Sequence, residues 1–463
     1  MTGLIQNVLI PVGEGYETVD LQIEADRIGA IQPAPLQTST DSYPDLVLPG
    51  FVNAHTHSVQ AWQRGLIPQL PLELWLADVL DTTPTTLEHH YLGAISTAVD
   101  TLMSGGTCLI DHAYLVMGKE VETIAALARG YKEVGIRAVI APLLQDLPFV
   151  LGLPGGCSLP QTAAPYSTAA LLEILENIVR QCHEPQAGIY IGVGPTGFQR
   201  CSDDLIQGCV EVSERYNLCR HTHLLETRSQ QLLAQERYGR SAVEHLQHLG
   251  FLDHRTTLAH GVWLTEQDMK ILAKTGSTVV HNPVSNLRLG SGIAPILKCL
   301  AAGVNVAIGC DGAASNDGQD LLEAIKLSAI LHNVTDFDYR NWLTPKRVVE
   351  LAALGGSRGI NLADQTGSLE VGKQADLVRY DLDDLSMLPQ TDVLQLLVLG
   401  RPDRVVQDVW VGGKQVVAEG KVLTVDVDNL RQELRLRNQF VNKPTFTTIQ
   451  SIESHYRSNL QRF

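Results

Sequence analysis

The chain has 463 residues, of which 44% are hydrophobic and 19% charged, a composition typical of a globular protein. Its formal net charge of −16 repels phosphate backbones and argues against nucleic acid as a partner. The chain has no run of about 18 apolar residues, no secretory leader pattern, and eight cysteines without a Cys-x-x-Cys pair, so we expect a cytoplasmic protein with no membrane span and reduced thiols.

Residues 1–50 favour the first part of a small β unit. Three β-leaning runs, separated by Gly and Asp, follow one another there: Leu4–Val12, Thr18–Ala25 and Arg27–Gln32.

From residue 51 to residue 364, short apolar runs alternate with longer helical segments, which predicts βα units around a parallel sheet. Helix signals include apolar residues at helical spacing in Leu87–Met103, capping residues at Ser202 and Thr265, and Thr344-Pro345 at the start of a late helix. The strand-like runs are Phe51–Ala54, Cys108–Asp111, Arg137–Leu143, Ile189–Val193, Leu218–His223, Thr257–His260, Thr278–His281 and Val304–Asp311. Eight strand–helix repeats predict an α/β fold of the (β/α)8 TIM-barrel type. A doubly wound open sheet is the alternative, although no Gly-x-Gly-x-x-Gly turn supports it.

Residues 365–425 return to a β-like pattern, in which Val409–Val417 predicts a hairpin around Gly412-Gly413. Because the ends of one domain often lie together, we expect residues 1–50 and 365–425 to form one small β-sandwich. Residues 426–463 predict a helical tail on the surface.

The segment Leu48–His57 ends in His-x-His after a short apolar run. Side chains alternate along a strand, so His55 and His57 point to the same side. Two imidazoles there can hold one transition-metal ion, and imidazole suits zinc or iron. This spacing alone more often belongs to exposed or singly hydrogen-bonded histidines, so a metal site needs further ligands.

Further ligand-type residues follow other predicted strands. Catalytic groups of such barrels project from the C-terminal ends of strands, and five strands here end in His or carboxylate side chains. The segments are His55-Thr56-His57, His221-Thr222-His223-Leu224-Leu225-Glu226, Ala259-His260-Gly261, His281-Asn282-Pro283 and Gly309-Cys310-Asp311-Gly312. A single strand-end histidine is more often structural. Five such ends around one barrel mouth favour a metal, which satisfies buried imidazoles and carboxylates together.

With these motifs the sequence resembles the amidohydrolase superfamily, within its TRZ/ATZ and S-adenosylhomocysteine/guanine deaminase-like branch. The matching motifs, in chain order, are PGFVNAHTH (Pro49–His57), HTHLLET (His221–Thr227), LAHGVWL (Leu258–Leu264), HNPVSNLRLGSGIAPI (His281–Ile296), GCDGAASND (Gly309–Asp317) and GSLEVGKQADLV (Gly367–Val378). The resemblance implies one divalent metal, zinc or alternatively iron, held by His55, His57, His223 and Asp311. It also implies that Glu226 and His260 line the reaction centre. We interpret His221 as interior packing.

Such a centre predicts a hydrolytic deamination. Three imidazoles and one carboxylate leave room for a water, whose pKa the metal lowers toward about 7. Asp311 can then take the water's proton, while His260 orients the nucleophile and stabilises the developing oxyanion. Glu226 can protonate a ring nitrogen of the substrate, so that hydroxide attacks an amidine-like carbon and ammonia leaves.

The fourth strand, which ends Val193-Gly194-Pro195-Thr196, carries no lysine. Binuclear members of the superfamily use a carbamylated lysine at this position. Its absence favours a single metal and argues against a dihydroorotase-like or hydantoinase-like enzyme.

Two departures from the resembling adenosine-type deaminases bear on the substrate. Those enzymes carry Gly-Pro-His after the fourth strand and a ribose-binding acid shortly after a Trp-Leu pair. This chain has Thr196 in place of that His and reads Asp81-Thr82-Thr83-Pro84 in the second region. The substrate is predicted to be an amino-substituted heterocycle of purine, pterin, pyrimidine or triazine type, and a smaller ring of this kind fits at least as well as a thioadenosine or homocysteine nucleoside. Candidate substrate contacts are Trp75, which could stack on a flat ring or simply pack, and Gln63, His112 and Thr196.

Two alternatives to a deaminase remain open at this point. A related chlorohydrolase, N-alkylaminohydrolase or cyclic C–N hydrolase would share the same inner residues. A non-catalytic metal-binding barrel is the more distant alternative, against which Glu226, His260 and Asp311 argue. By analogy with the resembling family, we also expect a homo-oligomer, as a dimer.

Overall fold

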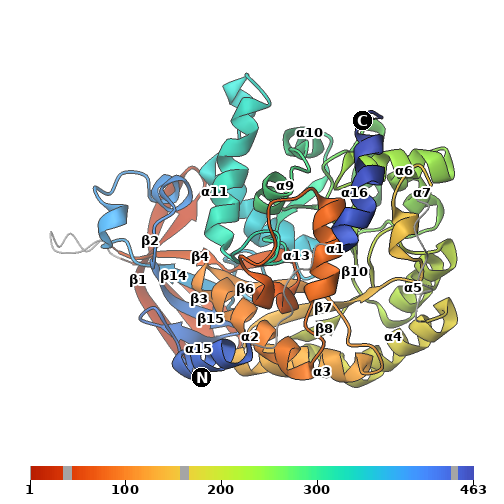
Figure 1. The fold of residues 1–463 in the computed structure, drawn as a ribbon. Coiled ribbons are helices and arrows are strands. Elements are labelled where there is room, and N and C mark those ends of the chain that lie inside the picture. The colour runs from red at the N-terminus through yellow and green to blue at the C-terminus, as the bar shows by residue number, and fades with distance from the viewer. Residues whose placement is uncertain (1, 35–43, 157–165, 439–446, 463) are drawn as a thin grey trace.

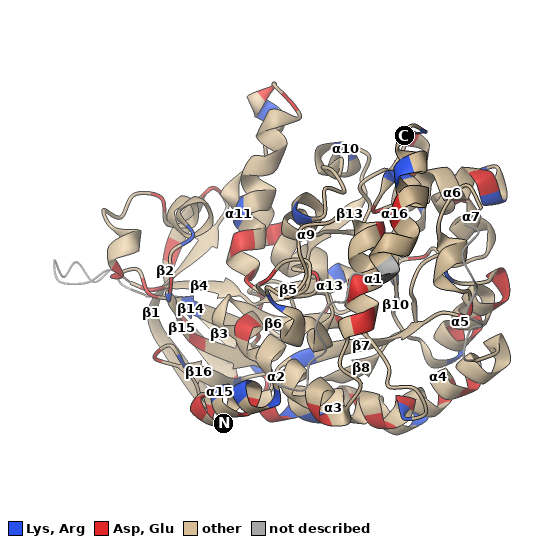
Figure 2. Ribbon diagram, viewed as in Figure 1, with Lys and Arg blue, Asp and Glu red and all other residues tan. Residues whose placement is uncertain are grey.

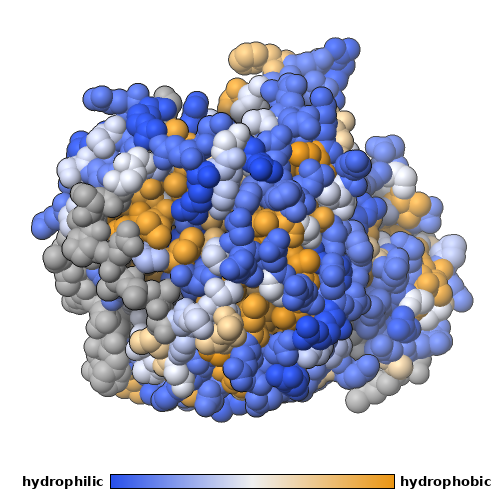
Figure 3. Space-filling model, turned by 90° about the vertical axis from the view of Figure 1, so that its right-hand side faces the viewer, coloured by the Kyte–Doolittle hydropathy of each residue, from blue (hydrophilic) through white to orange (hydrophobic). Residues whose placement is uncertain are grey.

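The computed structural model describes residues 2–34, 44–156, 166–438 and 447–462 (Figure 1). In this part of the chain, no helix combines the length and the apolar character needed to cross a lipid bilayer. Acidic and basic side chains are interspersed on the helices (Figure 2). On the face that Figure 3 shows, hydrophilic residues predominate and hydrophobic residues interrupt them in patches.

The middle of the chain forms two parallel sheets, one of five strands and one of four. The first contains β5 (Phe51–Thr56), β6 (Gly106–Ala113), β7 (Arg137–Leu144) and β8 (Ile189–Ile191), with the short strand β9 (Gly194–Pro195) paired to β7. The second contains β10 (Arg220–Leu224), β11 (Thr256–His260), β12 (Thr278–His281) and β13 (Asn305–Ile308). Most of these residues are buried, as expected for parallel strands covered by helices.

Each predicted strand of the middle region has a counterpart, with two differences. The fourth is divided into β8 and β9, because the chain leaves the β8 register before Gly194. The eighth ends at Ile308, so Asp311 lies in the loop beyond the strand. These two strands are where the backbone bends to bring loop residues over the sheets.

Helices connect the strands and surround them (Figure 1). Three capping residues act as predicted: Ser202 caps α5 (Asp203–Tyr216), Thr344 caps α12 (Pro345–Glu350), and Thr265 with Asp268 forms a capping box on α8 (Glu266–Thr275). Thr86 also caps α2 (Leu87–Met103). The other helices of this region are α1 (Leu72–Thr82), α3 (Glu120–Val134), α4 (Thr168–Cys182), α6 (Arg228–Tyr238), α7 (Ala242–His248), α9 (Pro283–Arg288), α10 (Ile296–Ala301), α11 (Leu321–Leu331) and α13 (Gly356–Gly359).

Strands from both chain ends share one eight-stranded sheet, in the order β17-β16-β15-β14-β4-β1-β2-β3. Their bounds are β1 (Thr2–Val12), β2 (Gly15–Glu24), β3 (Arg27–Pro33), β4 (Leu46–Pro49), β14 (Leu377–Tyr380), β15 (Val406–Val411), β16 (Lys414–Ala418) and β17 (Lys421–Val422). Strand β4 joins the two halves, since it pairs with β1 in parallel and with β14 in antiparallel orientation. The sequence predicted that both ends meet; within the described residues they form one continuous sheet, and the two-layered sandwich stays a prediction.

The C-terminal segment contains two helices, α15 (Val427–Arg437) and α16 (Thr447–Leu460). Helix α16 packs against α1, where Ile449 and Ile452 contact Leu74 and Ala77 in one apolar cluster. Figure 1 shows the two helices side by side. The predicted surface tail therefore supports α1, which carries residues of the central cavity.

Candidate metal centre and catalytic cavity

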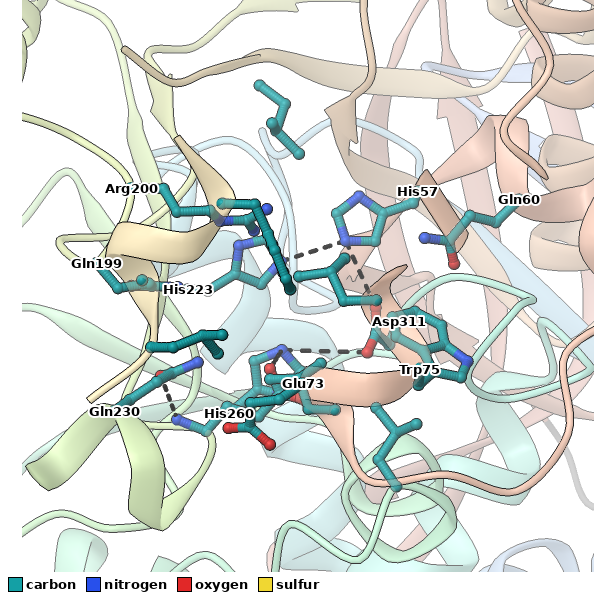
Figure 4. A pocket seen from close by; sticks show the side chains of 18 of the residues that line it. His57, Gln60, Glu73, Trp75, Gln199, Arg200, His223, Gln230, His260 and Asp311 are labelled. Carbon is teal, nitrogen blue, oxygen red and sulfur yellow. Dashed lines mark hydrogen bonds and ion pairs between the residues drawn. The ribbon is translucent and has the colours of Figure 1, made fainter. Parts of the chain in front are cut away.

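The strand-end histidines and Asp311 converge at one point (Figure 4). His57 Nε2 lies 3.2 Å from His223 Nε2 and 3.6 Å from Asp311 Oδ1, and His55 Nε2 lies 3.4 Å from the same oxygen. Within the part of the chain that the structure describes, three sets of three potential ligand atoms lie within 4.8 Å of one another: His55 with His57 and His223, His55 with His260 and Asp311, and His55 with His112 and His221. The structure thus brings together all four residues that the sequence assigned to a metal.

The outer nitrogens of two histidines are held by backbone carbonyls. His57 Nδ1 lies 2.7 Å from the carbonyl oxygen of His112, and His223 Nδ1 lies 2.6 Å from that of Thr196. A carbonyl only accepts, so each Nδ1 carries the proton and each Nε2 presents a lone pair toward the centre. This is the tautomer that a metal ligand requires.

His55 is oriented by a chain of side chains. Thr257 Oγ1 donates to the Arg220 carbonyl and lies 2.6 Å from His221 Nδ1, whose Nε2 lies 2.7 Å from His55 Nδ1. Because the hydroxyl proton of Thr257 goes to the carbonyl, Thr257 Oγ1 accepts from His221 Nδ1. His221 Nε2 then accepts from His55 Nδ1, which leaves His55 Nε2 without a proton. The interpretation of His221 as interior packing agrees with its burial but leaves out its hydrogen bond with the candidate ligand His55.

Burial and neighbouring charges give the centre the protonation states that metal binding needs. Burial lowers the pKa of His55 to about 4 and that of His223 well below its usual value, so both rings are neutral at neutral pH. Burial alone would raise the pKa of Asp311, but the adjacent His55, His260 and His57 outweigh it and keep this pKa well below the usual range. His55 and His223 are therefore neutral imidazoles, and Asp311 is a carboxylate.

This donor set fits a divalent metal ion. His55 Nε2 is a buried nitrogen without a hydrogen-bond partner among the described residues, although it faces the cluster. Asp311 and His260 also hold backbone φ angles of +63° and +77°, a region that side-chain-bearing residues rarely adopt. Such conformations persist where the surrounding structure enforces them, and here they aim both side chains at the centre.

Glu226 and His260 stand beside the cluster. His260 Nε2 lies 3.6 Å from Glu226 Oε2 and 4.0 Å from Asp311 Oδ2, and its Nδ1 donates to Asn286 Oδ1 at 2.9 Å. Burial, together with the charges of Asp311 and Glu73, raises the pKa of Glu226 well above its usual value. The raised pKa favours the protonated form of Glu226, which can donate a proton.

The cluster forms the floor of a cavity. Helix α1 contributes Glu73 and Trp75 to its wall, and the loop after β9 contributes Gln199 and Arg200 (Figure 4). The Trp75 ring is fixed by a hydrogen bond from its Nε1 to the Ala314 carbonyl at 3.1 Å. The sequence analysis missed Glu73, Gln199 and Arg200; the last two follow the fourth strand, so the strand-end rule could have found them.

Three of the predicted substrate contacts lie elsewhere. Gln63 is buried under α1, where its amide donates to the Val79 carbonyl and to Thr82 Oγ1. His112 is also fully buried, and its ring bonds the carbonyl oxygen of Gly194 behind the metal cluster. Thr196 is buried below the cavity wall, where its Oγ1 accepts from Arg200. Loop position in the sequence indicated proximity to the cavity but not the direction of these side chains.

Known proteins resemble this chain over almost its whole length. The model of the amidohydrolase family matches residues 46–416. A 5-methylthioadenosine/S-adenosylhomocysteine deaminase from Desulforudis audaxviator is 34% identical over 95% of this chain and 99% of its own, and a 5'-deoxyadenosine deaminase from Methanopyrus kandleri is 31% identical over 82% and 83%. Among solved structures, an adenosine deaminase from Xanthomonas campestris with bound zinc superposes with a TM-score of 0.81, at 27% identity, over 95% of this chain and 98% of that one. An atrazine chlorohydrolase from Arthrobacter aurescens shares the fold, with a TM-score of 0.83, 23% identity and coverage of 94% and 99%.

Proposed function

The chain belongs to the amidohydrolase family, and from that premise we propose that it is a metal-dependent hydrolytic deaminase of an amino-substituted N-heterocycle. One observation carries the proposal: the buried Glu226 carboxyl, whose pKa is raised, lies 3.6 Å from His260, beside the cluster of His55, His57, His223 and Asp311. A proton donor next to a hydrolytic centre is what the release of ammonia requires.

The residues that would hold the metal are His55, His57, His223 and Asp311. We propose one ion, zinc, with iron as the alternative, because neutral imidazoles and a carboxylate suit both. When bound, the ion acts as a Lewis acid that makes a water molecule nucleophilic near neutral pH. Val193-Gly194-Pro195-Thr196 supplies no lysine for a second ion.

The side chains then have distinct roles in moving protons. Asp311, with its lowered pKa, accepts a proton from the attacking water, and Glu226 gives its proton to a ring nitrogen of the substrate. His260 lies between these two carboxyl groups and steadies the oxygen that becomes negative. As the amino group departs, it takes up the proton held by Asp311, and the remaining proton of the attacking oxygen returns to Glu226. One water is consumed, one ammonia leaves, and the amino-bearing carbon becomes a carbonyl.

The alternatives differ in what leaves the ring. A chlorohydrolase, an N-alkylaminohydrolase or a cyclic C–N hydrolase would use the same inner residues, so the released product separates them. The deaminases among the relatives favour ammonia as the leaving group. A non-catalytic barrel would have no need of a carboxyl held in its acid form beside the ligand cluster.

An ammonia-coupled assay over purines, pterins, pyrimidines, triazines and adenosine-type nucleosides tests this function. The protein should contain about one metal ion per chain, lose activity on chelation, and recover it when zinc or iron is restored. Glu226→Gln should keep the metal and the fold but lose turnover. Release of chloride, an alkylamine or a ring-opened product without ammonia would favour the alternatives, and a metal-free protein without any release would favour the non-catalytic barrel.

We propose that the two parallel sheets are arcs of one closed (β/α)8 barrel over residues 51–364. A bridge between Val193 and Arg220 joins them on one side, and a hydrogen bond of 2.9 Å from the Asp311 amide to the His55 carbonyl joins them on the other. Residues 1–50 and 365–425 would be the second domain, since the strands of the shared sheet fall within these ranges. Residues 426–463 would be the helical tail.

We further propose a cytoplasmic homo-oligomer, as a dimer. The cysteines of the described residues are all free, as in a reducing compartment. Residues 330–342 project from the top of the molecule (Figures 1 and 3) and expose apolar side chains, of which Phe337 is 93% exposed. Light scattering of the wild type and of Phe337→Asp tests the dimer, which the substitution should weaken; a monomeric wild type would refute it.

A further inference from the structure

Arg200 is a buried cation in the wall of the cavity. It is 7% exposed, lies in the loop after β9, and lines the same space as His57, Glu226 and Trp75. Among the described residues its guanidinium has one hydrogen-bond partner, Thr196 Oγ1 at 3.2 Å, and it interacts with the charge of Glu226 without forming an ion pair with it. Burial lowers the pKa of this arginine, which reflects the cost of keeping the charge out of water.

Two other arginines of the described residues are buried to a similar degree, and both are well paired. Arg137 forms an ion pair with Asp376 at 3.1 Å. Arg220 donates to the carbonyls of Gly250 and Phe251 and lies 3.4 Å from Asp253. A buried charge without such partners is unfavourable, so the missing acceptor at Arg200 is expected to come from a ligand in the cavity.

Gln199, the neighbour of Arg200 in the chain, offers a hydrogen-bond acceptor beside the donors of Arg200. Gln199 is also 7% exposed and lines the cavity, and its Oε1 has no hydrogen-bond partner among the described residues. Figure 4 shows Gln199 and Arg200 on the side of the cavity away from Trp75. Arg200 offers donors and Gln199 offers an acceptor, which matches a ring carbonyl next to a ring N–H.

The pair lies close to the reaction centre. Thr196 connects them, since its carbonyl accepts from His223 Nδ1 and its hydroxyl accepts from Arg200. A group that Arg200 recognises is therefore expected to lie on or near the reacting ring.

We propose that Arg200 and Gln199 form a subsite for a lactam edge, so that the substrate is an amino-substituted heterocycle carrying a ring carbonyl next to a ring N–H. The inference rests on the proposed deaminase function and narrows its substrate class. It favours oxo-substituted amino purines, pyrimidines and pterins over adenine-type rings, which have no ring carbonyl. The relatives named for adenosine derivatives supply the competing substrate class.

Matched substrate pairs test the subsite: guanine with 2-aminopurine, cytosine with 4-aminopyrimidine, and pterin with 2-aminopteridine. Ammonia release from each compound, and from 5'-deoxyadenosine, is compared between the wild type and Arg200→Met. The same compound is compared in both proteins, so the intrinsic reactivity of each ring cancels. Arg215→Met, which removes a surface arginine paired with Glu176, is the control for the loss of a positive charge.

We expect Arg200→Met to lower kcat/KM for the wild type's preferred lactam substrate by about 10- to 100-fold, the effect of losing a hydrogen bond to a charged group. For the matched compound that lacks the carbonyl, kcat/KM should change less than threefold. Arg200→Lys should restore part of the preference for the lactam substrate. Metal content and melting temperature are measured on every variant, so that misfolding cannot imitate the selective loss.

The outcomes separate the inference from the function on which it rests. Equal losses on both members of a pair, or a wild type that prefers 5'-deoxyadenosine regardless of Arg200, would overturn the lactam subsite and leave the deaminase intact. Absence of ammonia from every compound, in a protein with a full metal complement, would overturn the proposed function and the inference together.

Discussion

The floor and the roof of the cavity are held together by different kinds of contact. The floor consists of side chains from the ends of β5, β10 and β11 and from the loop after β13, which are fixed by directional hydrogen bonds. His57 and His223 bond backbone carbonyls at 2.7 Å and 2.6 Å, and His55 bonds His221 at 2.7 Å. Each bond selects one tautomer and one ring orientation.

The roof, by which we mean the part of the cavity wall formed by α1 with α16 behind it, depends mainly on apolar packing. Helix α1 contacts α16 through Leu74 and Ala77, which pack on Ile449 and Ile452. Few polar contacts tie α1 to the floor; one is the bond of 2.6 Å from Thr227 Oγ1 to Glu73. Packing restricts the position of a helix less tightly than a network of short hydrogen bonds restricts a side chain. We therefore expect floor variants to affect chemistry and metal binding, and roof variants to affect substrate binding.

Asp311→Asn should cause the largest loss. Asp311 is proposed both as a metal ligand and as the acceptor of the water's proton, and general base catalysis alone contributes about 10²- to 10⁴-fold. We expect kcat/KM to fall by at least about 10⁴-fold, with reduced metal content measured by elemental analysis. Asp317→Asn, the same change at an exposed position of the same loop, should stay within a few fold. Comparable activity in the Asp311 variant would remove this residue from the mechanism.

Glu226→Gln should come next, with kcat lower by about 10²- to 10⁴-fold and metal content unchanged. Burial, Asp311 and Glu73 raise the pKa of Glu226, so its protonated form persists at neutral pH and is lost as pH rises through the raised pKa. Wild-type activity should therefore fall on the alkaline side, and this limb should be absent from the variant's residual activity. Glu73→Gln, a buried carboxyl of the roof, should keep kcat within about tenfold. An alkaline limb shared by Glu226→Gln would assign it to another group.

The floor is also the part that the sequence revealed. His55, His57, His223 and Asp311 are predictable because parallel strands place their C-terminal ends at one edge, so the motif spacing carries three-dimensional information. The two ends of the chain were likewise expected to meet, and β4 joins them in one sheet. What remained hidden was the direction of residues on irregular backbone.

Gln63 and His112 show the limit of that reasoning. Both lie near cavity-lining residues along the chain. Their side chains, however, point into the protein interior, where they form hydrogen bonds with the carbonyl groups of Val79 and Gly194. Arg200 and Gln199 face the cavity because the fourth strand breaks before Gly194. No periodic pattern marks such a break, and the contact of α16 with α1 depends on packing between residues almost 400 positions apart.

A smaller effect on the floor should come from Thr257→Val, which removes the hydroxyl that lies 2.6 Å from His221 Nδ1. His221 then has no partner to fix its tautomer, and His55 loses part of its orientation. Outer partners of metal-bound histidines typically contribute 10- to 100-fold in affinity, so we expect about that loss in a metal competition titration. Thr256→Val is the control, since that hydroxyl bonds the Phe251 carbonyl away from the centre. Unchanged metal affinity in Thr257→Val would show that His221 has only a packing role.

The smallest effect is expected from the roof, in Ile452→Ala on α16. Ile452 is buried against α1, and truncating a buried isoleucine typically costs about 2–5 kcal/mol, which here weakens the docking of α16. Because α1 carries Glu73 and Trp75 while the metal ligands lie on other elements, KM should rise by up to about tenfold with kcat and metal content near the wild type. Leu460→Ala, at an exposed position of the same helix, should change neither constant. A loss of kcat or of metal in Ile452→Ala would mean that packing in the roof also holds the floor, and the two regions could then not be treated as separate.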